Sequence, residues 1–127
     1  MNETCNLRAQ MTIDFRKMRI RLNKDSLHLL GDPKYIQLLV NINKHLIAIR
    51  AVDETQVDLQ SYKINHIDSE FPLEIYSSKL FTRLYSEFKC FNKEYSYHLP
   101  GKAQQSEGII FFDIDSLQKN EIHEYRL

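Results

Sequence analysis

The feature that most constrains the fold of this chain is an order of short segments that occurs twice: strand, short helix, strand, strand. In each copy a capping residue marks the helix, Asn23 in the first and Ser77 in the second, and apolar residues at helical spacing follow it. Short strands mixed with short helices predict an α+β fold. We expect one small barrel or sandwich built from two such halves, at about residues 13–52 and 61–115.

In the first half, residues 15–22 alternate between apolar and basic side chains, which predicts a half-buried edge strand that follows a frayed terminus at residues 1–12. Residues 24–30 fit a short helix, because Gly31 occupies the position where a left-handed residue ends a helix. The apolar run at residues 35–42 and its return at residues 46–52 predict two strands that are buried on both faces and lie centrally in the sheet.

The second half repeats the order after a polar, acidic stretch at residues 53–60 and a short strand within residues 61–67. Its helix carries a broad apolar stripe, and Pro100-Gly101 is typical of a turn. The expected elements are a strand at 73–76, a helix at 79–88, a strand at 95–99, a polar loop at 102–107, a buried strand at 108–114 and a last short helix at 116–124.

Length and composition exclude several classes of protein. The chain has 127 residues, which suggests a single domain over residues 1–127. Only three glycines are present, so phosphate-cradling loops such as the P-loop are excluded, and no Gly-x-Ser-x-Gly motif occurs. We therefore predict a protein that is not an enzyme, with no catalytic residue and no cofactor.

Two distant cysteines, Cys5 and Cys90, do not make a disulfide framework, and no run of apolar residues is long enough to span a membrane. The polar start of the chain lacks the apolar core of a signal peptide. These features predict a cytoplasmic location with reduced thiols and no membrane contact.

Charge is distributed unevenly although the net charge is zero. Residues 1–50 hold nine basic and four acidic residues, whereas residues 51–127 hold eight basic and thirteen acidic ones. The basic residues cluster on and around the first strand, so that alternate side chains are spaced to follow successive phosphates of double-stranded DNA. The alternative is a basic strand that only keeps a sheet edge soluble, or two halves that attract each other. The candidate nucleic-acid-binding residues are Arg16, Lys17, Arg19, Arg21 and Lys24.

Two other groups of residues are candidate sites. The five histidines show no metal-ligand spacing, and Asp113 with Asp115 fits a loop and a helix cap better than a cation site, so we predict no metal. Aromatic residues crowd the second half, where they either fill the core or bind a protein partner. These aromatic residues are Tyr85, Phe88, Phe91, Tyr95 and Tyr97.

Residues 18–52 resemble the AbrB-type swapped-hairpin family, including its tandem MraZ-type relatives. The resemblance rests on the segment from Ile20 to Asn23, the Leu-His-Leu-Leu-Gly sequence that ends at Gly31, and the strand from Leu46 to Arg50. It implies a strand, a short helix and a strand pair, and it implies DNA binding. The family's arginine in the short helix is missing here.

Two functions follow as expectations. The first is an AbrB-like DNA-binding transcriptional regulator of a bacterial or mobile-element gene set. The second is a phage- or mobile-element-encoded modulator that binds a protein partner through the aromatic second half. A tandem chain predicts either a monomer that is a pseudo-dimer or a homodimer.

Overall fold

One antiparallel sheet organises the part of the chain that the structure, a computed structural model, describes: residues 6–64, 71–116 and 118–119. The fold is α+β, with mostly antiparallel strands and short helices. In chain order the elements are β1 (Gln10–Asp14), β2 (Arg19–Leu22), α1 (Lys24–Leu29), β3 (Tyr35–Asn41), β4 (Leu46–Val52), β5 (Ser61–Lys63), β6 (Leu73–Tyr76), α2 (Ser78–Glu87), β7 (Ser96–Gln104), β8 (Ile109–Asp113) and β9 (Gln118–Lys119).

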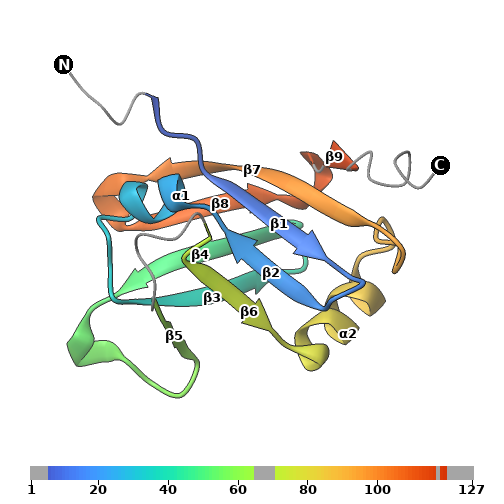
Figure 1. The fold of residues 1–127 in the computed structure, drawn as a ribbon, viewed down its shortest axis with the longest axis horizontal. Helices are drawn as coiled ribbons and strands as arrows, with labels where there is room; N and C mark the ends of the chain where they lie inside the picture. Colours follow the sequence, from blue (N-terminus) through green and yellow to red (C-terminus); the bar gives the residue numbers. More distant parts are fainter. Residues whose placement is uncertain (1–5, 65–70, 117, 120–127) are drawn as a thin grey trace.

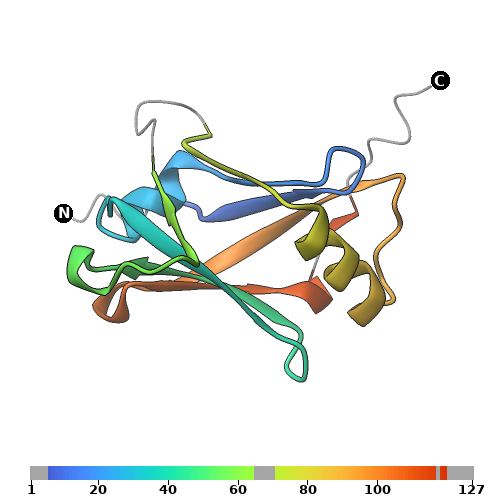
Figure 2. The same cartoon turned by 90° about the horizontal axis from the view of Figure 1, so that it is seen from below.

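The sheet curls into a small barrel-like shape. Its strand order is β5-β3-β4-β8-β7-β1-β2-β6, and β9 pairs with β7 beside this path. Figures 1 and 2 show β1, β2 and β6 lying over β3, β4 and β8. The long strand β7 belongs to both layers, since its first part pairs with β1 and its second part with β8. Among the described strands, β5 and β6 are the two ends of this path.

The bend in β7 explains a prediction that was wrong. Pro100 and Gly101 do not end a strand; they lie within β7, which continues to Gln104 through residues predicted to be a loop. A Cβ atom at Gly101 would lie 2.6 Å from the ring of Phe112 and 2.7 Å from Ile110. Glycine therefore allows β7 to press against the core where it passes from one layer to the other.

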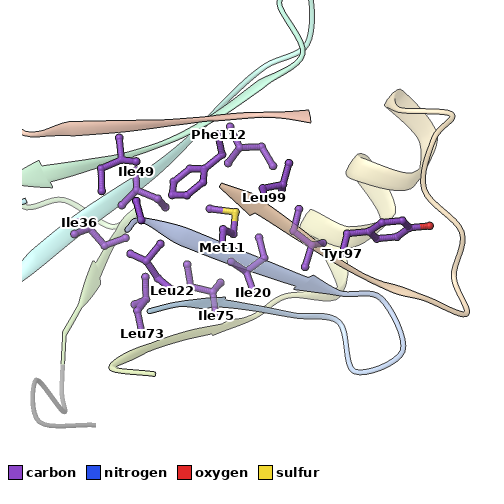
Figure 3. Close-up of a cluster of buried hydrophobic side chains, with 14 of the residues drawn as sticks. Met11, Ile20, Leu22, Ile36, Ile49, Leu73, Ile75, Tyr97, Leu99 and Phe112 are labelled. Carbon is purple, nitrogen blue, oxygen red and sulfur yellow. The ribbon is translucent and has the colours of Figure 1, made fainter. Parts of the chain in front are cut away.

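The core lies between the two layers (Figure 3). Alternate residues of facing strands point inward and are fully buried, including Met11 and Ile13 from β1 and Ile47 and Ile49 from β4. Because side chains alternate across a strand, each of these strands buries one row and turns the other outward. The outward row of the β1, β2 and β6 layer carries the predicted basic residues of β2.

The N-terminal strand was missed. Residues 10–12, expected to be frayed, begin β1, and the predicted strand 15–22 is a turn followed by β2. Asp14 makes this turn, because its carboxylate accepts hydrogen bonds from the backbone N–H groups of Arg16 and Lys17, and Met18 takes a positive φ of 51°. The β1–β2 hairpin is thus formed by an aspartate turn without glycine.

Both helix starts are confirmed. The Asn23 side chain accepts a hydrogen bond from the Ser26 N–H at the start of α1, and the Ser77 hydroxyl accepts one from the Leu80 N–H at the start of α2. Gly31 has a φ of 84°, as its position after α1 predicts.

The predicted last helix is wrong where it can be compared. Residues 118–119 form β9, which pairs with Tyr97 and His98 of β7. Asp113 caps the 3-10 turn before it, since its carboxylate accepts from the N–H of Asp115. Residues 117 and 120–124 of the predicted helix lie outside the described residues.

Candidate binding groove

The five basic residues predicted to bind DNA do not form one open row. β2 is not an edge strand, because it lies between β1 and β6. Arg16 and Lys17 are exposed in the β1–β2 turn, and Lys24 opens α1. Arg19 and Arg21 share the outward face of β2, where each has an acidic residue directly opposite in the sheet.

Arg19 is held on this face by its neighbours. Its side chain is only 12% exposed, and it pairs with Asp14 at 3.4 Å and donates to the Tyr76 hydroxyl at 3.5 Å. Burial works to lower the pKa of Arg19, but the hydrogen bond to Tyr76 and the nearby carboxylates outweigh it and raise the pKa above its usual value. Arg19 is therefore a structural cation of the sheet.

Arg21 is neutralised in the same way from the other side. Its Nε donates to the Glu74 carboxylate at 2.6 Å, and its guanidinium lies 4.6 Å from the centre of the Phe71 ring. Arg21 and Glu74 are register partners of the β2–β6 ladder. Nothing in the local sequence around Arg21 indicates an acidic partner that lies 53 positions later.

The aromatic residues of the second half fill the core. Phe88, Phe91 and Tyr97 are buried, and Phe91 packs 4.9 Å from Phe15, ring centre to ring centre. Tyr85 remains exposed on α2. Most of this group is thus closed to a partner, because the first half supplies Phe15 as the centre of the cluster.

Each of the described histidines contacts a neighbouring side chain. His45 pairs with Asp115 at 3.0 Å and His28 with Asp32 at 2.7 Å, while His98 makes a hydrogen bond of 3.1 Å with Thr12. No cluster of potential metal ligands occurs among the described residues. His66, His123 and Cys5 lie outside them, as does Glu121. Cys90 is a free thiol whose pKa is raised by burial.

The end of β3 differs from these balanced regions. β4 pairs with β3 along its whole length, but β5 pairs only with residues 35–37. The predicted central position is confirmed for β4, which lies between β3 and β8, but Arg50 is exposed, so β4 is not buried on both faces throughout. The prediction is wrong for the end of β3, where Leu39 and Val40 are 37% and 38% exposed. Among the described strands, none pairs with the other side of residues 38–41.

A groove of about 550 Å³ lies beside this free edge, between β3 and α2, and we call it the β3–α2 groove. The two elements stand apart on the same side of the molecule (Figure 2). The volume falls in the usual range of ligand pockets, roughly 300–1,000 Å³. The main contributions come from Leu38, Val40 and Ile42 of the β3–β4 hairpin, from Leu59 and Tyr62 around β5, and from Lys79, Leu80 and Arg83 of α2.

The charges of the groove are all positive. Lys79 and Arg83 line it, and none of the described lining residues is acidic. Arg83 pairs with Glu87 at 3.2 Å, and its side chain is still largely exposed, whereas Lys79 has no ion pair among the described residues. Because α2 begins at Ser78, the positive end of its helix dipole also lies at the groove.

The groove suits binding better than catalysis. Its lining has no carboxylate, histidine or cysteine that would act as a base, nucleophile or metal ligand. It offers an apolar floor, a free strand edge and two cations. Sequence reasoning missed it, although the signal was present: residues 38–40 are apolar on both faces of the strand, which is unusual at a sheet edge.

Comparisons with known proteins add no relative. No family model, no curated protein and no solved structure matches the chain.

Within the described residues, no helix has the length and apolar character that crossing a membrane requires.

Proposed function

We propose that this chain is a small, non-enzymatic protein-binding domain and that the β3–α2 groove is its binding site. The observation that carries the proposal is the uncovered end of β3, where Leu38, Leu39 and Val40 leave a strand edge without charge or proline. Sheet edges are normally blunted by such residues or covered by other elements. An open apolar edge beside a lined groove is typical of a surface that receives another polypeptide.

The charge pairs on β2 favour a protein partner over DNA. Binding to duplex DNA depends on cations that are free to replace the counterions of phosphates. Asp14 and Glu74 occupy Arg19 and Arg21, so only Arg16, Lys17 and Lys24 of the predicted set are available. Nucleic-acid binding by these residues stays a prediction.

We also propose that the barrel consists of two related halves, as in the AbrB-type tandem proteins. Corresponding strands of the two halves pair with each other, β2 with β6 and β4 with β8. The strand that precedes the strand–helix–strand–strand unit of each half also pairs with a strand of the other half, because β1 pairs with β7 and β5 with β3. These pairings support a pseudo-twofold arrangement that one chain completes alone. Sedimentation equilibrium tests this proposal: a monomer mass supports it, and a stable dimer contradicts it.

Selection from a random peptide library displayed on phage tests the binding site. The wild-type domain is the target, and selected peptides are then measured against two variants, Val40→Asp and Leu39→Asp. These neighbouring side chains are equally exposed but lie on opposite faces of β3. We expect Val40→Asp to weaken binding by about tenfold or more, since a carboxylate in an apolar contact is costly.

Leu39→Asp is the matched control, and its affinity should stay within about threefold of wild type because the change lies on the other face. If Leu39→Asp abolishes binding and Val40→Asp does not, the site is the outer face of the sheet and the groove proposal is wrong. If no peptide is enriched over an unrelated control protein, the protein-binding proposal itself fails.

A further inference from the structure

We infer that the partner enters the β3–α2 groove as one extended, acidic peptide segment, which adds to the free edge of β3 as an antiparallel strand in line with β5. This inference rests on the proposed protein-binding function. It specifies the backbone conformation, the direction and the charge of the ligand.

The free backbone groups are those of Leu38 and Val40. The Lys34 carbonyl accepts a hydrogen bond from the Ile64 N–H at 2.8 Å, so the backbone groups of Lys34 point toward β5. Along a strand these directions alternate, which turns the N–H and C=O groups of Leu38 and Val40 toward the same side. There the described chain offers no ladder partner, whereas Leu39 and Asn41 face β4.

The chain itself leaves this place open because β5 starts late. Continuing the β3–β5 register would put residues 58–60 opposite residues 38–40. Instead, residues 58–61 form a turn in which the Asp58 carboxylate accepts from the Gln60 N–H and the Asp58 carbonyl from the Ser61 N–H. The turn carries Leu59 into solvent, fully exposed. A peptide that continues β5 occupies the vacated position.

The side chains of the groove prescribe an alternating ligand. In an antiparallel ladder, residues opposite Leu38 and Val40 exchange both hydrogen bonds with them and point their side chains to the same face. That face of β3 contributes to the groove together with Leu80 of α2. The two peptide residues opposite Leu38 and Val40 should therefore be apolar, and their own N–H groups should point at β3.

The charges of the groove select an acidic peptide. Lys79 and Arg83 line the groove across from β3; Lys79 has no ion pair among the described residues, and Arg83 shares its charge with Glu87 but stays largely exposed. Acidic residues of the peptide can meet these cations where their side chains point to the groove face. A second copy of the chain is a poor occupant, because a twofold pairing of two β3 edges brings its own Lys79 and Arg83 to the same interface. Like charges brought together in this way oppose association.

Synthetic peptides test the inference directly. The first is a fluorescein-labelled peptide of eight residues in which the four groove-facing positions carry two Val residues, opposite Leu38 and Val40, and two Glu residues, with Thr at the four positions between them. The second has Lys in place of both Glu residues. Fluorescence anisotropy should show the Glu peptide binding about tenfold more tightly than the Lys peptide, since two partly exposed ion pairs are exchanged for repulsion. The Lys79→Glu/Arg83→Glu double variant should reverse this preference. Equal affinity of both peptides for the wild type contradicts an acidic ligand.

Backbone methylation separates strand addition from other modes of binding. Methylating the amide nitrogens of the Val residues removes the donors that face β3, and we expect binding to fall by about tenfold or more. Methylating the amides of the intervening Thr residues instead changes only the opposite edge, so affinity should stay within about threefold of the unmethylated peptide. If both methylated peptides bind alike and still depend on the Val40 side chain, strand addition is wrong while protein binding stands.

A substitution in the protein tests the same backbone hydrogen bonds between the peptide and β3. Val40→Pro removes the N–H that points to the free edge and leaves the ladder bonds of Leu39 and Asn41 to β4 in place. It should abolish binding of the Glu peptide, whereas Val40→Thr, which keeps the N–H and loses only part of the apolar contact, should still bind measurably. Slow hydrogen exchange of the Leu39 and Asn41 amides confirms that Val40→Pro is folded. Wild-type affinity in folded Val40→Pro overturns the inference, and if that variant does not fold, the methylated peptides decide.

Discussion

The outward face of β2 is closed to a binding partner, whereas the free end of β3 is open to one. β2 lies between two strands, and each of its arginines meets an acidic residue from a neighbour, Asp14 in one case and Glu74 in the other. Among the described strands, β4 alone lies beside the end of β3. The number of neighbouring strands, more than the residue types, decides which row remains available to a partner.

The largest expected effect comes from opening the closed face. Asp14→Ala removes the partner of the buried Arg19 and the acceptor of two turn amides. We expect the free energy of unfolding to fall by about 2–4 kcal/mol, because a poorly exposed guanidinium loses its counter-charge. Urea denaturation measures this change. Affinity for groove peptides should stay unchanged, and a loss of affinity without a loss of stability would contradict the separation of the two regions.

A smaller effect is expected for the second pair on the same face. A double-mutant cycle with Arg21→Ala and Glu74→Ala should give a coupling energy of about 0.5–1 kcal/mol, since both side chains are about one-third exposed. The Phe71 ring contributes to the Arg21 single variant but cancels in the cycle. Chemical denaturation of the four proteins provides the values. A coupling energy near zero would mean that Arg21 is free for another partner.

Local signals were sufficient to predict both helices and the order of most strands. Asn23, Gly31 and Ser77 act within one turn of the chain, and their capping roles depend on nothing distant. The β1–β2 hairpin was not predicted, although its turn is also a local feature. Its turn relies on Asp14 and on a positive φ at Met18, residue types that do not announce a turn as glycine or proline does.

The candidate site was less accessible to prediction because it depends on register between distant strands. The basic residues around Arg19 and Arg21 were visible in the sequence, but the pairing of Arg21 with Glu74 is set by the β2–β6 ladder. The groove depends on where β5 stops, which the turn at Asp58 decides. An apolar run such as residues 35–42 indicates a strand and does not reveal which of its edges is covered.

We also expect weak, salt-sensitive binding to duplex DNA. Only Arg16, Lys17 and Lys24 of the basic set lack the pairs that hold Arg19 and Arg21. Any slope of log affinity against log salt should be shallow, and Arg16→Ala/Lys17→Ala should reduce its magnitude by about 2. Fluorescence titration with a random duplex at several salt concentrations gives the slope. A steep slope that Arg19→Ala and Arg21→Ala flatten would show that the closed face opens to DNA.

The smallest expected effect is a pH dependence confined to the closed face. His98 lies on β7 opposite Thr12, and burial lowers its pKa. The unfolded chain, with a histidine pKa of about 6.5, therefore takes up a proton at a higher pH than the native state does. The stability that neutral His98 contributes is complete above that value and is lost as the pH falls from about 6.5 toward the lowered native pKa. Denaturation of wild type and His98→Asn between pH 7.5 and 5.5 should show a steeper loss of stability for wild type. The affinity of the Glu peptide for the groove should stay constant, because His98 does not line the groove. Equal pH slopes for the two proteins would show that His98 does not cause the pH dependence of stability. A peptide affinity that falls together with the stability would mean that the two regions are coupled.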